Sequence, residues 1–395
     1  MRIAICSPVT LQFFRKDVDG GKSLPEGYRY PLAAHLVRTY LQQGHSVAII
    51  TCAPDAHDEQ VYHGKKLEIY VVPRRRVRQM ILDAYAKERA GLTKCLLKFK
   101  PDIVHANWTY EFAHASLASN LPTLVTARDA PWTIFRHTLS LYRLFRAIYA
   151  NKIFEFNFRF TSISPYLCNR IKNEYPYSPK SAMVPNGLKS ELFSKQTNIA
   201  EGLIVAVSCW DRRKRPKDSI KAFSQVRKAI PNAELAMIGT GLEPEGPAHN
   251  WAKKKGLAEN IQFLGYQSQE EVLAILRNRT SVFLHSTYEE SFCMTILEAM
   301  AQSLPIVAYP NSGAIPWLIN GDCGLLAEKR TPEDLASRLI ELLQSPDLRQ
   351  KLGRNAYERA SKHFKLENVA NQYLAQYSKT IEQFDAQKNK SLTII

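Results

Sequence analysis

The chain has 395 residues, enough for two domains that each bury a core of their own. Its 45% hydrophobic and 23% charged residues exclude a disordered chain and an integral membrane protein as overall classes. Lysines and arginines number 53 against 37 acids, a net charge of +16, which favours anionic partners such as phosphates, nucleic acid or an anionic membrane surface.

Short β-branched runs alternate with helix-length amphipathic stretches along the chain, and the pattern restarts once. The first set of predicted strands is Arg2–Ser7, Ser46–Thr51, Leu67–Val72, Ile103–His105, Thr123–Thr126 and Phe160–Ser164. The second set is Leu203–Ser208, Glu234–Ile238, Ile261–Phe263, Ser281–His285 and Pro305–Ala308. Such alternation predicts an α/β fold of two doubly wound units, with ligands bound beyond the carboxyl ends of the strands.

Seven cysteines are scattered without a C-x-x-C pair, which argues against a zinc knuckle or a disulfide framework and for a reducing compartment. Nowhere do about 18 apolar residues run without a charge, so membrane contact would have to be peripheral. We therefore expect a cytoplasmic protein, at the inner face of the membrane if it associates with one.

Residues 288–301 carry the strongest chemical signal. They follow the predicted strand 281–285 and open a helix, with Glu290 in the loop and Glu298 about two turns along. Unpaired backbone N–H groups near residues 292–294 would form an anion site between the two carboxylates. This arrangement suits a phosphosugar, although spacing alone favours two solvated surface acids.

Glycines after the first strand, Gly27 among them, would let the backbone approach a ligand, but an ordinary flexible loop would look the same. Neither half of the chain has G-x-G-x-x-G followed by an acid about 20 residues later, which argues against a dinucleotide-dependent dehydrogenase.

Taken together, the order and spacing of several motifs resemble the retaining GT-B glycosyltransferases of family four, also called glycosyl transferases group 1. The motifs are Glu290 and Glu298 with Phe292 between them, L-E-A-M-A at 297–301, P-I-V-A at 305–308, G-A-I-P at 313–316, G-L-L at 324–326, V-P-N-G at 184–187, G-T-G at 239–241 and F-L-G at 263–265. The resemblance implies two Rossmann-like domains facing a central cleft. The acceptor would bind to residues 1–190 and the nucleotide-sugar to residues 191–365, and a C-terminal helix and tail at 366–395 would cross back to the first domain.

The same resemblance implies transfer with retention of anomeric configuration, no metal, and no cofactor beyond a nucleoside-diphosphate sugar as co-substrate. On the donor side it implies Glu290 for the sugar hydroxyls, Glu298 for the ribose, the backbone of Phe292, Cys293 and Met294 for sugar and phosphates, and Gly265 and Tyr266 for the base.

A basic loop, residues 207–216, falls where the family has an arginine and a lysine. Lys214 matches the lysine and would stabilise charge on the leaving diphosphate. Cys209 stands at the arginine position, and we predict that Arg213, rather than Arg212, replaces that arginine. A solvated basic loop is the alternative interpretation.

Many relatives carry a histidine after the strand equivalent to 123–126, where this chain has Arg128. Arginine cannot act as a base near neutral pH, so we predict that Arg128 binds an acceptor or phosphate anion on the same side as Gly27. Asp129 is then the candidate general base or acceptor-hydroxyl contact. Local loop stabilisation by Arg128 and Asp129 fits equally well.

Two basic stretches rich in apolar and aromatic residues, 74–100 and 133–160, indicate the acceptor. Such segments can lie on an anionic bilayer, so we predict peripheral membrane contact and a glycan or lipid-linked acceptor, in cell-surface polysaccharide or glycolipid synthesis. An anionic soluble glycan would explain the same charges. No nucleic-acid partner is expected, because no binding motif is present. The alternative function is a non-catalytic sugar- or nucleic-acid-binding protein with a degenerate site.

Overall fold

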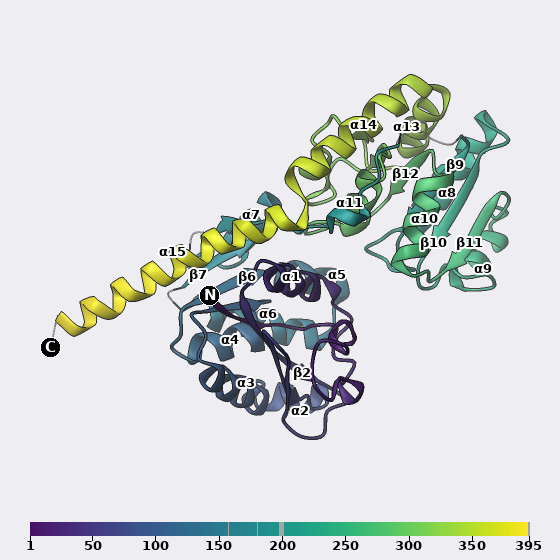
Figure 1. The fold of residues 1–395 in the computed structure, drawn as a ribbon. Helices are drawn as coiled ribbons and strands as arrows, with labels where there is room; N and C mark the ends of the chain where they lie inside the picture. The colour runs from purple at the N-terminus through teal and green to yellow at the C-terminus, as the bar shows by residue number, and fades with distance from the viewer. Residues whose placement is uncertain (157, 180, 197–200, 394–395) are drawn as a thin grey trace. The chain divides into compact units, whose positions relative to one another are not determined.

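The computed structural model describes residues 1–156, 158–179, 181–196 and 201–393. The chain divides into two compact units (Figure 1). Unit 1 contains Met1–Gly187 and Leu366–Ile395, and unit 2 contains Leu188–Lys365.

Unit 1 is built on an eight-stranded sheet in the order β3-β4-β2-β1-β5-β6-β7-β8. Every pairing is parallel except β3 with β4. Its strands are β1 Arg2–Cys6, β2 Ser46–Ala53, β3 Gln60–His63, β4 Leu67–Pro73, β5 Ile103–Asn107, β6 Thr123–Ala127, β7 Arg159–Ser162 and β8 Ala182–Met183. Its helices are α1 Pro31–Gln42, α2 Val77–Leu82, α3 Ala86–Phe99, α4 Glu111–Ala118, α5 Pro131–Thr138, α6 Leu141–Phe154, α7 Pro165–Glu174 and α15 Leu366–Thr393.

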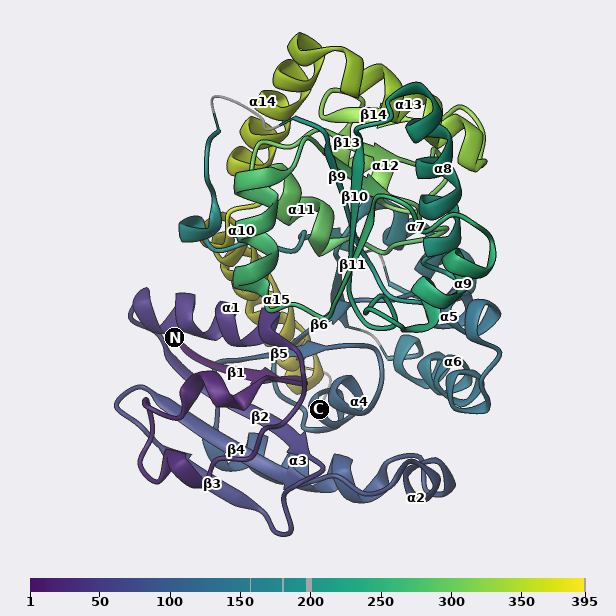
Figure 2. The same cartoon turned by 90° about the vertical axis from the view of Figure 1, so that its right-hand side faces the viewer.

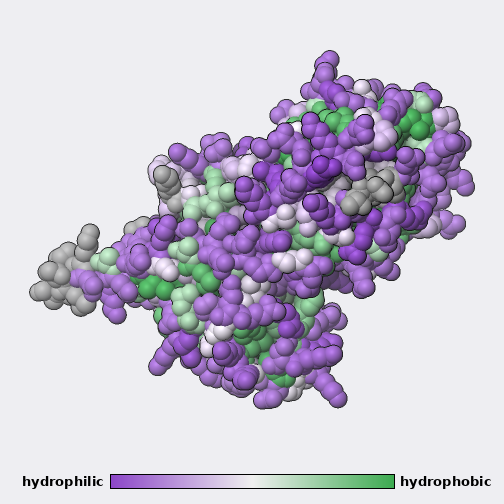
Figure 3. Space-filling view, turned by 45° about the horizontal axis from the view of Figure 1, so that its top comes forward, coloured by the Kyte–Doolittle hydropathy of each residue, from purple (hydrophilic) through white to green (hydrophobic). Residues whose placement is uncertain are grey.

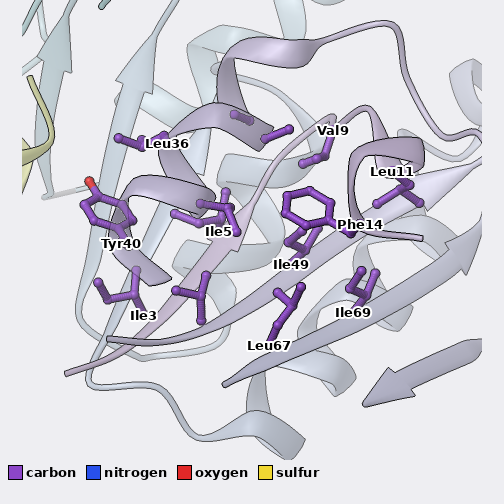
Figure 4. Packing of buried hydrophobic residues seen from close by; sticks show 14 of the residues in the cluster. Ile3, Ile5, Val9, Leu11, Phe14, Leu36, Tyr40, Ile49, Leu67 and Ile69 are labelled. Carbon is purple, nitrogen blue, oxygen red and sulfur yellow. The ribbon is translucent and has the colours of Figure 1, made fainter. Parts of the chain in front are cut away.

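One face of this sheet packs against α1, and Figure 4 shows the contact. Pro31 supplies the fixed φ that suits the first helical position, and the apolar side of α1, including Leu36 and Tyr40, is buried. Ile3 and Ile5 of β1 point into the same core. Because β-strand side chains alternate between faces, Ala4 and Cys6 fall in a second core with α3 and α4.

The last helix, α15, belongs to unit 1 and packs against α1. Its Tyr377 hydroxyl lies 2.9 Å from the Tyr40 hydroxyl and 2.7 Å from His105 Nδ1, while His105 Nε2 lies 2.7 Å from Thr126 Oγ1. All of these groups are buried, so His105 is a hydrogen-bonded core histidine.

Unit 2 is built on a six-stranded, wholly parallel sheet in the order β11-β10-β9-β12-β13-β14. Its strands are β9 Leu203–Val207, β10 Glu234–Ile238, β11 Ile261–Gly265, β12 Val282–His285, β13 Ile306–Ala308 and β14 Gly324–Leu326. Its helices are α8 Pro216–Ala229, α9 Pro247–Lys254, α10 Gln269–Arg279, α11 Met294–Ala301, α12 Ile315–Ile319, α13 Pro332–Gln344 and α14 Pro346–His363. Figure 2 shows α10, α11 and α14 on one face of the sheet and α8, α9 and α13 on the other.

Three strands are absent from the predicted set: β3, β8 and β14. β3 pairs antiparallel at the sheet edge and buries only Tyr62, so it has no apolar run to detect. β8 and β14 have two and three residues. The other strands match the predicted ones within one or two residues at each end, because most of them are buried apolar runs.

Candidate functional site

Glu290 lies in the loop between β12 and α11, and the backbone holds it there. Its N–H donates to the Ser312 carbonyl at 3.2 Å, and its carbonyl accepts from the Ala314 N–H at 2.8 Å. Gly313 has φ +77°, and a Cβ there would lie 2.4 Å from the Glu290 carbonyl oxygen, so only glycine lets the two loops approach this closely. Because α11 begins at Met294, Glu298 lies about one turn along the helix, not the two turns predicted.

Two cations surround the Glu290 carboxylate. Lys214 Nζ donates to Oε1, and Arg213 Nη1 lies 3.6 Å from Oε2 and donates to the Glu289 carbonyl at 2.8 Å. Burial alone would raise the pKa of Glu290, but Lys214, His285 and Arg213 outweigh it and hold that pKa well below its usual range. The carboxylate is therefore charged at neutral pH.

The basic side chains of the loop 207–216 differ in whether they contact Glu290 or are exposed to solvent. Lys214 and Arg213 reach Glu290, whereas Arg212 is exposed to solvent. Burial raises the pKa of the Cys209 thiol, which agrees with a small apolar filler rather than a nucleophile. Arg213 thus supplies a second cation close to the position where the family pattern has its arginine.

His285, at the end of β12, is a residue of this site that sequence reasoning missed. Its Nε2 lies 3.7 Å from Glu290 Oε1 and 3.5 Å from Cys293 Sγ. Burial alone would lower the pKa of His285, but Cys293 and Glu290 beside it raise that pKa to about 9. Burial alone would raise the pKa of the Cys293 thiol, and His285 overcomes this and lowers it. The only sequence signal for His285 was its place at the carboxyl end of a strand.

Cys293 is the N-cap of α11 with φ +85°, a conformation that favours glycine. The first N–H groups of α11, starting at Met294, have no acceptor within the helix and carry the positive end of its dipole. The Phe292 ring is buried against the rings of Trp317 and Phe364.

Glu298, at 8% exposure, accepts a 2.6 Å hydrogen bond from Gln269 Nε2. Burial raises its pKa, and the bond from Gln269 opposes that rise. Gln269 begins α10 and was not found from the sequence, because it is about 30 positions from its partner. Gly265 ends β11 with φ +65°, and the Tyr266 ring after it is 78% exposed. An exposed aromatic ring at a strand end is a ready platform for stacking a base.

On unit 1, Arg128 is held by two amides: it donates to Asn107 Oδ1 at 3.0 and 2.7 Å, and to Asn186 Oδ1. These bonds occupy much of its hydrogen-bonding capacity, so the geometry favours loop stabilisation over anion binding. A Cβ at Gly27 would lie 2.6 Å from the Val9 carbonyl oxygen, so this glycine allows two loop segments to pack. Asp129 accepts a 3.1 Å hydrogen bond from the Tyr110 hydroxyl.

Next to Asp129 lies a group that we call the Arg146 cluster: Arg146, Trp108, Tyr110 and Glu111. The guanidinium lies 3.5 Å from the Tyr110 ring centroid and 5.0 Å from that of Trp108. Arg146 Nε and Nη2 and Glu111 Oε2 are buried without a hydrogen-bond partner. Burial alone would lower the pKa of Arg146, but Tyr110 and Glu111 outweigh it and raise that pKa, so the cation persists. Buried polar atoms without a protein partner are uncommon, so these atoms keep hydrogen-bonding capacity for another group.

The structure therefore brings the predicted donor-side residues to one edge of the unit 2 sheet, where β9, β11 and β12 end. Gly27, Arg128 and Asp129 belong to unit 1.

Known proteins resemble the chain along most of its length. Sucrose-phosphate synthase from Thermosynechococcus elongatus superposes with a TM-score of 0.76 at 18% identity, covering 97% of this chain and 100% of that one. The "MMP alpha-(1->4)-mannosyltransferase" of Mycolicibacterium hassiacum is 30% identical over 224 residues, 56% of this chain and 54% of that protein, so the match spans about half of the relative. The "Alpha-monoglucosyldiacylglycerol synthase" of Acholeplasma laidlawii is 23% identical over 88% of this chain and 92% of its own length.

Two Rossmann-like units, each built on a largely parallel sheet, together with these structural neighbours define the fold as GT-B, the fold of a large class of glycosyltransferases. Residues 32–192 match "Glycosyltransferase Family 4" and residues 189–359 match "Glycosyl transferases group 1". The chain belongs to this glycosyltransferase family, as its motifs predicted.

Proposed function

We propose that the protein transfers a sugar from a nucleoside-diphosphate sugar to a glycan or lipid-linked acceptor, with retention of configuration and without a metal ion. The observation that carries this proposal is the convergence of Lys214, Arg213 and Glu290 beside the N-terminus of α11.

Each member of the unit 2 site has a physical part in that reaction. Negative charge builds on the diphosphate as the donor bond breaks, and Lys214, Arg213 and the α11 N–H groups can stabilise it. Glu290, held charged, accepts hydrogen bonds from donor-sugar hydroxyls, and Glu298 accepts from the ribose. When the diphosphate binds, it competes with Glu290 for Lys214, which frees the carboxylate for the sugar.

The acceptor side is proposed to include the Arg146 cluster. Aromatic rings pack against sugar faces, and the unpartnered atoms of Arg146 and Glu111 offer donors and an acceptor to hydroxyl or anionic groups. Asp129, bonded to Tyr110 of the same cluster, is the proposed acceptor-hydroxyl contact or base. An acceptor carrying a phosphate or carboxylate would fit the unpaired guanidinium best.

Membrane contact is proposed through α2 and the segment joining α5 to α6, since α2 packs against α6. Leu82, Leu139 and Leu141 are 87%, 72% and 83% exposed, and Arg78 and Arg136 beside them are exposed. Exposed leucines among arginines suit an anionic bilayer surface. The face drawn in Figure 3 is mostly hydrophilic, with apolar side chains in small separate patches. Among the described residues, no helix is long and apolar enough to cross a membrane.

The first experiment is a thermal-shift screen against nucleoside diphosphates and nucleotide-sugars, because a ligand of the native state raises apparent stability by RT ln(1 + [L]/Kd). Stabilisation by one nucleotide, lost in Lys214→Ala, supports the donor site. The stabilising donor is then incubated with candidate acceptors with and without a chelator, and the anomeric configuration of the product is read by NMR. An inverted product, or a rate abolished by the chelator, would contradict the proposed mechanism.

Cys209 at the family's arginine position favours a second candidate, a sugar-binding protein with a degenerate site. Thermal stabilisation by a nucleotide-sugar that is neither transferred nor hydrolysed would support this second hypothesis.

The anionic-membrane proposal is tested separately by co-sedimentation with phosphatidylglycerol and phosphatidylcholine vesicles, using Leu139→Asp as the matched variant. Equal binding to both vesicle types would contradict it.

A further inference from the structure

Three side chains of different metal-binding chemistry converge at the start of α11. They are the His285 imidazole, the Cys293 thiol and the Glu290 carboxylate, and one ligand atom from each lies within 4.8 Å of the others. His285 and Cys293 are 2% and 8% exposed, whereas the Glu290 side chain keeps 12% exposure. A cation could therefore reach the group past Glu290, from the side where the donor is proposed to bind.

The spacing of these atoms suits a tetrahedral ion. Zinc bonds of about 2.0–2.1 Å to nitrogen and 2.3 Å to sulfur, at a tetrahedral angle, place the two ligand atoms about 3.5 Å apart. Nε2 of His285 and Sγ of Cys293 are 3.5 Å apart, and Nε2 lies 3.7 Å from Glu290 Oε1. Nitrogen, sulfur and oxygen from three residues make a donor set that a hard ion such as Mg²⁺ would not select.

We propose that His285, Glu290 and Cys293 form a site for a zinc-type divalent cation, and that its occupancy inhibits the protein. Glu290 Oε1 now accepts from Lys214 Nζ, so a metal ion on that oxygen competes with Lys214 for the carboxylate. Binding the metal therefore weakens the contact with Lys214 and occupies carboxylate oxygen that the donor sugar would use. Lys214 and Arg213 repel the incoming ion, so the site is a reversible one of moderate affinity rather than a permanent structural centre.

The metal site is tested first by spectroscopy, without reference to activity. The full chain, kept reduced with a phosphine, is titrated with Co²⁺, and thiolate-to-cobalt charge transfer is followed in the near-ultraviolet. Wild type is expected to show a band that saturates at one equivalent and disappears on adding Zn²⁺. Cys293→Gly, which suits the φ of +85°, and Cys293→Ser are expected to lose the band, while Cys209→Ser keeps it. Circular dichroism melts show that each variant is folded.

The absence of a saturable band in wild type would overturn the metal site, as would a folded Cys293 variant with an unchanged band or the loss of the band in Cys209→Ser.

The proposal that zinc inhibits the protein rests on the proposed function and is tested by Zn²⁺ titration of sugar transfer. Each variant is compared with its own metal-free rate, and Cys293→Gly is expected to need about tenfold more Zn²⁺, since one of three ligands is gone. Zinc-insensitive transfer by a wild type that shows the band would overturn inhibition alone. A cobalt band in a protein that transfers no sugar would contradict the proposed function and leave the metal site standing.

Discussion

The carboxyl edges of the two sheets differ in how their buried charges are compensated. In unit 2, Glu290 is surrounded by Lys214, Arg213 and His285, and every charge has an opposite charge nearby. In unit 1, Arg146 lies among aromatic rings, and its Nε and Nη2 are unpartnered.

The difference teaches what each edge is suited to bind. The unit 2 cluster holds more positive than negative charge, so it attracts a diphosphate, and Lys214 can turn from Glu290 to the phosphates. A buried cation with unused donors gains most from a ligand that completes its hydrogen bonds. Under the proposed function, charge would select the donor on unit 2, and hydrogen bonding with aromatic packing would select the acceptor on unit 1.

The largest effect is expected from Lys214→Ala. Removing a preorganised cation from a developing diphosphate charge should lower kcat about 10²–10³-fold. The control is Lys217→Ala, because Lys217 Nζ lies 5.3 Å from the ring centroids of Trp210 and Trp251 and belongs to another contact. Steady-state kinetics give kcat for both variants. Equal kcat values for the two would contradict the role proposed for Lys214 at the donor site.

The substitution Arg146→Met tests the acceptor site proposed for unit 1. Losing charged hydrogen bonds of about 1.5–3 kcal/mol should raise the acceptor KM about 10–100-fold with the donor KM unchanged. Because the change leaves the buried Glu111 carboxylate without its neighbouring cation, the free energy of unfolding should also fall, by about 3–5 kcal/mol. Arg143→Met, one turn earlier on α6, is the matched control. A large loss of stability with an unchanged acceptor KM would show that Arg146 is only structural.

A smaller effect is expected where α15 joins unit 1. Tyr377→Phe removes the hydroxyl that links Tyr40 to His105, leaving buried polar groups unpaired, and should cost about 1–3 kcal/mol of unfolding free energy. Tyr40→Phe removes one of these contacts and leaves Tyr377 bonded to His105, so it should cost less. Urea unfolding of both variants measures the loss of unfolding free energy. A larger loss in Tyr40→Phe than in Tyr377→Phe would contradict this hydrogen-bond network.

The smallest effect is a pH dependence in unit 1. Burial, with Arg89 beside it, lowers the pKa of His114 from 6.5 to about 4. The unfolded chain therefore takes up this proton first, so the contribution is fully present above about pH 6.5 and is lost as pH falls toward 4. The melting temperature of wild type should drop more than that of His114→Gln between those values. Parallel curves for the two proteins would refute the assignment.

Much of the fold was predictable, because strand and helix periodicity is local. The buried β-branched runs of β1, β2 and β10 need no partner to be recognised, whereas the edge strand β3 depends on pairing with β4. The family motifs likewise pointed to Glu290 and Lys214 as candidates, and Arg213 was predicted as the replacement for the arginine that the pattern lacks here. The roles of Arg128 and Gly27 were less accessible, since both depend on which loops lie against them.

The sequence by itself determined the α/β class, the family and the residue types of the donor site, since these follow from patterns within short windows. Only the tertiary structure decided that His285 meets Cys293 and Glu290, that Gln269 meets Glu298, and that Arg146 stands among aromatic rings. The physical reason is that parallel strands end at one edge of a sheet, and the order in which they pair is set by packing of the whole unit. Residues from different loops therefore become neighbours through contacts that no local pattern records.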